Sequence, residues 1–278
     1  GDKFEQGGFT VESNTFGTLF HPIAISNIIH SALTENTVVD VFQRDDLYFS
    51  WDSASKIYAT SEAKLIETVL EKRNRLAERI KSSRLICITL GTAWEYKLKS
   101  SETVVGNCHK APQNLFEKSL STIDEMRKEW ERVLLLIRSF NPTAKIVFTV
   151  SPVRHAKDGL IENNRSKARL LELIQQLSQS NKLIYFPSYE IAIDELRDYR
   201  FYKKDLVHPS SEAIEIIWER LIQHVLDEKD VYLLELIGQY RSMCDHDLMH
   251  PESSSASSFE KRKADLKEKI LSSGIEIK

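Results

Sequence analysis

The sequence predicts an α/β protein, a three-layer α/β/α sandwich with a mainly parallel sheet and a helical C-terminal extension. Three short apolar runs, residues 85–90, 145–150 and 183–186, each end at a glycine, serine or proline, as buried parallel strands do. Amphipathic helical stretches lie between these runs. Such alternation is typical of a parallel sheet that is covered by helices on both faces.

The predicted elements follow one another in order along the chain. An extended segment at residues 9–13 comes first, and a helix led by Pro22 follows it. Apolar residues recur on one face of four further predicted helices, at residues 61–82, 120–140, 165–180 and 210–226. Two insertions, residues 38–51 and 95–105, predict hairpins. We expect both at the carboxyl ends of strands, where sheets of this kind bind ligands.

The pattern changes near residue 230, which divides the chain into an α/β domain at residues 1–229 and a helical extension at residues 230–278. Residues 231–243 and 259–271 predict helices, and the serine-rich residues 253–258 predict a linker. We interpret the extension as a surface appendage rather than a second catalytic domain.

Composition excludes several classes of protein. The 278 residues carry a net charge of −3, so there is no basic field that indicates nucleic-acid binding. No apolar run is long enough to span a membrane. Three unpatterned cysteines (Cys87, Cys108 and Cys244) indicate no disulfide framework and favour a reducing, cytoplasmic compartment without fixing it. The oligomeric state is not indicated.

The pair Asp205 and His208 is the strongest candidate for catalysis. An Asp three residues before a His can direct its carboxylate at one ring nitrogen, which leaves the other free to take a proton from a nucleophile. The following helix places its positive end near His208 and favours the neutral ring that a general base needs. The alternative is an ordinary polar helix start, with Asp205 bound to loop amides.

Five further residues are candidates for oxyanion or substrate contacts, because each follows a predicted strand or a short extended segment. They are Gly17, Gly91, Asn107, Arg154 and His155. A glycine lets a backbone N–H approach an anion closely, and an asparagine amide can donate to an oxyanion. Simple turns would explain the glycines and the asparagine equally well, and exposed loop positions would explain Arg154 and His155.

A run near the C-terminus, Cys244-Asp245-His246-Asp247 with His250, invites a metal interpretation. The ligand types are mixed in softness, and the segment has the pattern of a helix end. We therefore predict no metal site, and no organic cofactor is required.

Several ordered motifs together resemble the GSCFA-domain family of bacterial proteins, which is related to the SGNH (GDSL-like) hydrolases. They are Asn14-Thr15-Phe16-Gly17, Leu90-Gly91-Thr92-Ala93-Trp94, Val104-Val105-Gly106-Asn107-Cys108-His109-Lys110, Ser151-Pro152-Val153-Arg154-His155, Glu162-Asn163-Asn164 and Asp205-Leu206-Val207-His208-Pro209-Ser210. The resemblance implies a flavodoxin-like sheet and a serine nucleophile after its first strand. It also implies that Asp205 and His208 are the acid and base, and that Asn107 with Gly17 or Gly91 forms the oxyanion hole.

One family motif is absent from these residues. The Gly-Ser-Cys-Phe-Ala motif, which would carry the nucleophile, is expected a few residues before Gly1, together with the first strand of the sheet. We therefore expect a chain that begins at Gly1 to be a truncated or processed piece and to be inactive by itself.

Two functions remain open at this stage. The first is an SGNH-like hydrolase that acts on ester or acyl groups of a small molecule, carbohydrate or lipid. The second is a non-catalytic module that binds a glycan or a protein. Its contact surfaces would be the aromatic insertion around Tyr48, Phe49 and Trp51 and the charged C-terminal tail.

Overall fold

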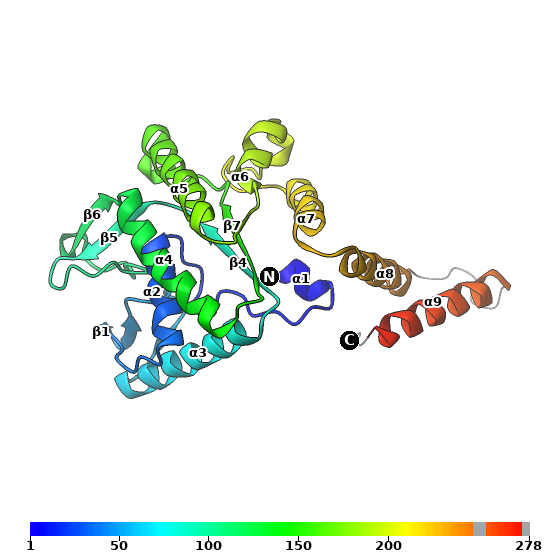
Figure 1. The fold of residues 1–278 in the computed structure, drawn as a ribbon, viewed down its shortest axis with the longest axis horizontal. Helices are drawn as coiled ribbons and strands as arrows, with labels where there is room; N and C mark the ends of the chain where they lie inside the picture. The colour runs from blue at the N-terminus through cyan, green and yellow to red at the C-terminus, as the bar shows by residue number, and fades with distance from the viewer. Residues whose placement is uncertain (247–253, 274–278) are drawn as a thin grey trace. The chain divides into compact units, whose positions relative to one another are not determined.

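The computed structural model describes residues 1–246 and 254–273 of a mixed α/β protein. It divides into two compact units (Figure 1). The larger unit is residues 14–217, and the smaller one combines residues 1–13 with residues 218–278. The domain boundary predicted at residues 229–230 marks where the α/β domain gives way to the C-terminal extension, and it stays a prediction.

A parallel sheet lies at the centre of the larger unit. Its strands run in the order β4 (Leu85–Leu90), β7 (Lys145–Val150) and β8 (Ile184–Tyr185). The three predicted apolar strands are confirmed, although the last is shorter than expected. Because all three point the same way, Gly91 and Ser151 directly follow neighbouring strands at the same end of the sheet.

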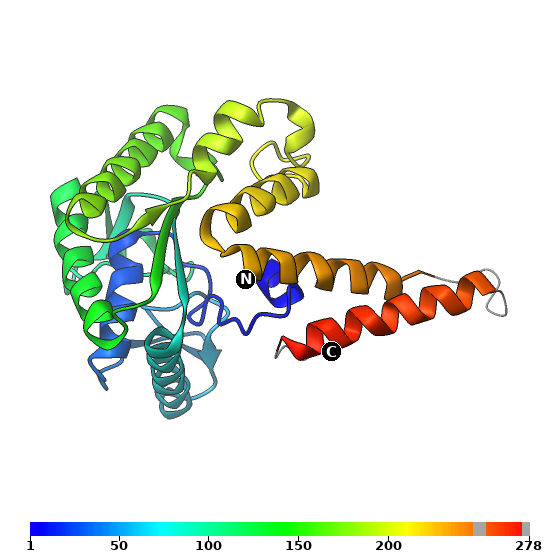
Figure 2. The ribbon, with the colours of Figure 1, turned by 45° about the vertical axis from the view of Figure 1, so that its right-hand side comes forward.

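Four long helices lie on one side of this sheet (Figures 1 and 2). They are α2 (Pro22–Leu33), α3 (Glu62–Ser82), α4 (Ile123–Phe140) and α5 (Leu160–Ser180). The connections β4–α4–β7 and β7–α5–β8 advance across the sheet in one direction, so right-handed crossovers place α4 and α5 on the same face. Ser61 caps α3, and Thr122 with Glu125 forms a capping box on α4. Helix α5 begins five residues before its predicted start.

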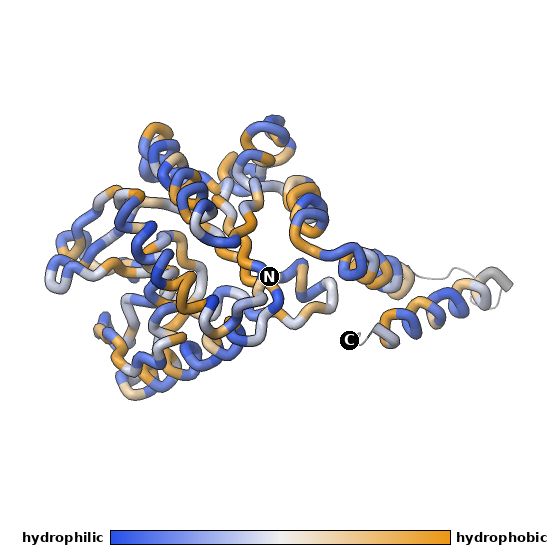
Figure 3. The backbone as a smooth tube through the Cα atoms, viewed as in Figure 1, coloured by the Kyte–Doolittle hydropathy of each residue, from blue (hydrophilic) through white to orange (hydrophobic). Residues whose placement is uncertain are grey.

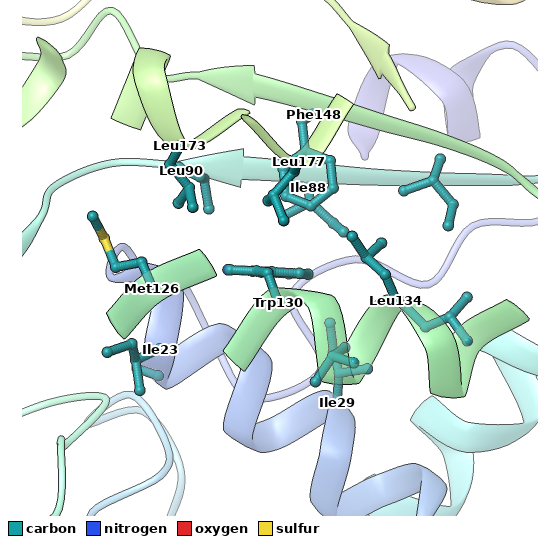
Figure 4. Packing of buried hydrophobic residues seen from close by; sticks show 14 of the residues in the cluster. Ile23, Ile29, Ile88, Leu90, Met126, Trp130, Leu134, Phe148, Leu173 and Leu177 are labelled. Atoms are coloured by element: carbon teal, nitrogen blue, oxygen red, sulfur yellow. The ribbon is translucent and has the colours of Figure 1, made fainter. Parts of the chain in front are cut away.

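Trp130 of α4 is the largest side chain that is fully buried in the core. Its ring meets the ring of Phe148 on β7 edge-on, with the two centroids 4.9 Å apart. Figure 4 shows Trp130 between the sheet and Ile29 of α2. The indole N–H finds no hydrogen-bond partner in the described structure, so hydrophobic packing alone holds this ring in place.

Strand β4 was predicted to be buried on both faces, and this prediction is wrong. Ile88 and Leu90 are buried against the helices, but Cys87 and Thr89 on the other face are exposed. Among the described strands β4 pairs with β7 alone, so it forms an edge of the sheet. The parallel three-stranded sheet is therefore established, while a third layer over this face is not shown.

Both predicted insertions contain antiparallel strands. β1 (Val41–Arg44) and β2 (Leu47–Ser50) form the first hairpin, to which β3 (Tyr58–Ala59) adds. In the second insertion, β5 (Trp94–Leu98) makes only a short antiparallel bridge across the expected turn, from Lys97 to Val104. Its main partner is β6 (Phe116–Leu120), which lies beyond the predicted hairpin. Strand β6 was not predicted from the sequence.

Short helical turns fill the remaining connections. They are η1 (Gln113–Leu115), η2 (Ala156–Asp158), α6 (Ser188–Glu190), η3 (Ile191–Glu195) and η4 (Tyr199–Phe201). Helix α7 (Ser211–Val225) then follows the predicted acid–base loop, close to its predicted bounds.

The smaller unit contains α1 (Asp2–Gln6), α8 (Glu228–Cys244) and α9 (Ser254–Ser272). Leu233 and Ile237 of α8 form an apolar cluster with Ile270 of α9, and Figure 3 shows apolar and polar residues alternating along both helices. The predicted linker is wrong for residues 254–258, which belong to α9, and residue 253 lies outside the described residues. Residues 9–13 are not a strand, because none of the described strands pairs with them.

None of the helices among residues 1–246 and 254–273 combines the length and apolarity needed to cross a bilayer.

Replacing Trp130 with alanine should lower the free energy of unfolding by about 3–5 kcal/mol, because the cavity cannot be refilled from a packed core. Trp130→Phe keeps most of the ring and removes the unpaired N–H, so its cost should stay below about 1.5 kcal/mol. Urea denaturation followed by circular dichroism measures both. The control Leu135→Ala, on the same helix and 70% exposed, should change stability by less than about 0.5 kcal/mol.

Candidate functional site

The loop between Lys203 and Pro209 holds Asp205 and His208 in a fixed arrangement. The N–H of Lys203 donates to the carbonyl of His208 over 2.8 Å and closes the loop at its base. Leu206 adopts a φ of 56° at the turn. Asp205 Oδ1 accepts the main-chain N–H groups of Val207 and His208, both at 2.9 Å, and its Oδ2 lies 2.7 Å from His208 Nδ1.

These contacts determine the ionisation of Asp205. The N–H of His208, then the N–H of Val207 and then the imidazole ring hold the pKa of Asp205 well below its usual range. The ionised carboxylate accepts the Nδ1 proton, so Nε2 of the neutral ring is the acceptor. Nε2 has no hydrogen-bond partner within residues 1–246 and 254–273, and the two side chains are 48% and 55% exposed. The pair is therefore assembled and open to solvent, with no described nucleophile on it.

Both glycines proposed for the oxyanion hole use their N–H groups elsewhere. Gly17 donates to the Asn14 carbonyl over 2.7 Å, and Gly91 donates to the Phe20 carbonyl over 2.8 Å. A Cβ atom on Gly17 would overlap Ala54, and one on Gly91 would lie 2.9 Å from Phe20 Cβ. In this structure the two glycines permit close packing, and their donor role stays a prediction.

Asn107 keeps its amide nitrogen available. Its Oδ1 accepts the N–H of His109 at 2.7 Å and the hydroxyl of Ser55 at 3.1 Å. The structure gives Nδ2 no partner among the residues it describes. Asn107 is half-buried, so its side chain is only partly covered by the protein.

Arg154 and His155 lie at the carboxyl end of β7, as predicted. The Arg154 guanidinium lies over the ring of Tyr202, 5.7 Å from its centroid, and Tyr202 bridges to Pro209 beside the acid–base loop. The His155 ring meets the Phe20 ring edge-on at 5.5 Å. Burial, and secondly the charge of Lys167, lower the pKa of His155, which favours the neutral ring.

Lys167, which was not predicted from the sequence as a site residue, holds the two strand ends together. Lys167 is 1% exposed, and its Nζ donates to the carbonyls of Gly91 and Ser151, each at 2.6 Å. Burial lowers its pKa to about 8. A signal was available, because Lys167 lies three and seven residues before Leu170 and Ile174, on the helix face that is buried.

Two other polar residues of α5 hold the same strand-end loops. Ser166 Oγ accepts the N–H of Ala93 at 2.7 Å, and Asn163 Oδ1 accepts the N–H of His155 at 3.0 Å. The first turns of α5 thus contact the loops that follow β4 and β7 through hydrogen bonds, whereas the rest of the buried helix face packs through apolar side chains.

A buried serine, histidine and glutamate lie together beneath α2 but not in the order of a catalytic triad. His21 Nδ1 accepts the Ile23 N–H, so its Nε2–H donates to Ser121 Oγ over 2.9 Å. Ser121 in turn donates to Glu95 Oε2 over 2.6 Å. Burial lowers the pKa of His21 to about 4. Because the serine proton goes to the carboxylate, this network is structural.

The part of the chain that is described contains no group of three or more potential metal-ligating side chains. Asp247 and His250, from the possible metal motif, lie outside the described residues.

Comparison with known protein families matches residues 1–221 to the GSCFA family. A search of curated proteins found no match.

The buried charge of Lys167 predicts a dependence of stability on pH. With a pKa of about 8 in the folded chain and 10.5 as its ordinary value, the unfolded chain binds the proton more tightly between these pH values. The free energy of unfolding should therefore rise with pH in this window, by up to about 1.4 kcal/mol per pH unit.

Urea unfolding of the wild type and Lys167→Met at pH 7.5 and pH 9.5 measures this contribution. Lys167→Met should be the less stable protein at both pH values, because the carbonyls of Gly91 and Ser151 lose their donors. The difference in free energy of unfolding between the wild type and Lys167→Met should be larger at pH 9.5 than at pH 7.5. A difference that stays the same at both pH values would contradict the assignment.

Proposed function

Because the chain belongs to the GSCFA family, we propose that it is the acid–base part of a serine hydrolase that cleaves ester or acyl groups. The observation that carries the proposal is the 2.7 Å contact between Asp205 Oδ2 and His208 Nδ1, in a His208 side chain that is 55% exposed and whose Nε2 has no partner among the described residues. A carboxylate that fixes the tautomer and an imidazole with an open nitrogen are what a general base requires.

The proposed reaction has two steps. A serine outside these 278 residues, in the family's Gly-Ser-Cys-Phe-Ala motif, attacks the carbonyl carbon while His208 Nε2 takes its proton. The tetrahedral oxyanion accepts hydrogen bonds from Asn107 Nδ2 and from main-chain N–H groups of the nucleophile loop. The alcohol then leaves with the proton of His208, and water releases the acyl group by the same route in reverse.

The proposed architecture is the SGNH type, a three-layer sandwich with the site at the carboxyl ends of the strands. The parallel order β4–β7–β8 supports it, because sheets of this class bind ligands at that edge. Arg154 and His155, which follow β7, are proposed substrate contacts. We propose small-molecule, carbohydrate or lipid esters as substrates, and the reaction needs no metal or cofactor.

The alternative, a binding module with an aromatic surface, has no specific observation in its favour. Phe49 is buried, and Trp51 stacks on Phe42 with ring centroids 3.6 Å apart and contacts His109. These rings pack against each other and so offer little free face to a sugar.

The acid–base proposal predicts the kinetics of two variants in the protein expressed with its upstream residues. His208→Ala should abolish turnover of p-nitrophenyl acetate. Asp205→Asn should lower kcat by about 10³–10⁴-fold, because the amide favours the wrong tautomer. Lys204→Ala, an exposed change in the same loop, is the control and should match the wild type. Equal rates for wild type and His208→Ala would refute the assignment.

A fluorophosphonate probe tests where the nucleophile lies. It should label the protein that carries the upstream motif and leave residues 1–278 unlabelled, since no described serine hydroxyl contacts His208 Nε2. Mass spectrometry identifies the labelled residue. Covalent labelling of a serine within the 278 residues would show that the proposed nucleophile is wrong.

A further inference from the structure

We propose that Ser55 is a positioning residue for the oxyanion donor Asn107. Its hydroxyl, together with the main-chain N–H of His109, holds Asn107 Oδ1 and leaves Nδ2 to donate to the ligand. This inference rests on the proposed function and adds to it the means by which the donor is oriented.

The orientation of the Asn107 amide follows from its contacts. The N–H of His109, 2.7 Å from Asn107 Oδ1, donates only to an acceptor, so the oxygen must lie on this side. Ser55 Oγ approaches the same oxygen to 3.1 Å from a segment 52 residues earlier in the chain. With both contacts on Oδ1, the NH2 group forms the other arm of the planar amide, and its two N–H donors point away from Ser55 Oγ and the His109 N–H.

The loop that carries Asn107 is strained and anchored. His109 and Lys110 have φ angles of 49° and 56°, a left-handed conformation that is unfavourable for residues other than glycine. The His109 ring is buried, its Nε2 lies 2.9 Å from the Ser50 carbonyl, and the Phe42 and Phe49 rings surround it. Strain that surrounding contacts maintain is typical of functional loops.

Ser55 lies where it can act on this loop. Its Oγ is 3.2 Å from His109 Nδ1 as well as 3.1 Å from Asn107 Oδ1. Burial lowers the pKa of His109, and the neutral ring donates from Nε2 to the Ser50 carbonyl. Nδ1 is then a second acceptor beside Asn107 Oδ1, and the single hydroxyl proton of Ser55 is shared between them. The preceding N–H of Ala54 donates to the Phe16 carbonyl over 2.8 Å and fixes the backbone beside Ser55. The exposed hydroxyl thus links the two loops.

A double-mutant cycle on the protein with its upstream residues tests the proposal. Asn107→Ala should lower kcat by about 100-fold with little change in KM, because the lost contact belongs to the transition state. Ser55→Ala should lower kcat by about tenfold, and Ser55→Thr, which keeps the hydroxyl, should restore it. The double variant should be no slower than Asn107→Ala alone, since Ser55 acts only through Asn107. Ser101→Ala, in an exposed turn, is the control.

Two outcomes would overturn the inference: kcat of Ser55→Ala equal to that of the wild type, or a further tenfold loss in the double variant. If no variant and no wild-type preparation hydrolyses an ester, the proposed function fails, and NMR of the 278-residue chain decides the inference. The Asn107 side-chain N–H signals should shift in Ser55→Ala and stay in place in Ser55→Thr and Ser101→Ala. Unchanged signals in Ser55→Ala would reject the positioning role.

Discussion

The ammonium group of Lys167 is the interaction on which the candidate site depends. It joins the carbonyls of Gly91 and Ser151, the residues that directly follow β4 and β7. A buried cation is unfavourable unless hydrogen bonds satisfy it, so the two strand ends and α5 must keep one arrangement together. Ser166 and Asn163 fix the next loop residues from the same helix. The packing of α5 on the sheet and the geometry of the loops after β4 and β7 are therefore a single constraint.

Short-range patterns predicted much of the fold. The apolar runs at β4 and β7 and the helical periodicity of α3 and α4 were sufficient, because each element carries its own signal. Strand β6 was missed because its partner β5 lies about twenty residues away. Residues 9–13 have the composition of a strand, but a strand forms only where a partner pairs with it.

The site could be predicted in its local part only. The spacing of Asp205 and His208 anticipated a contact that the structure contains, since the two residues are only three positions apart in one loop. The occupied N–H groups of Gly17 and Gly91 depend on the carbonyls of Asn14 and Phe20, and the second of these pairings is set by tertiary packing. The burial of Lys167 was not predicted, because a lysine side chain is almost always exposed even where its neighbours on the helix face are apolar.

Residues 16–20 connect the predicted site residues, which come from different strands. The Phe16 carbonyl accepts the Ala54 N–H beside Ser55, and the Phe20 carbonyl accepts the N–H of Gly91. Leu19 lies against Gly106, next to Asn107. The Phe20 ring contacts His155. A substitution in this short segment would thus alter the contacts of several candidate site residues at once.

The open edge of β4 has a geometric consequence. Its outward N–H and C=O groups form a template on which an extended segment can add as a further parallel strand. A segment paired in that direction would end level with Gly91, at the same edge of the sheet as Ser151. Whatever residue follows such a strand would be delivered to the strand ends that Lys167 holds together. Strand addition and assembly of the site would then be one event.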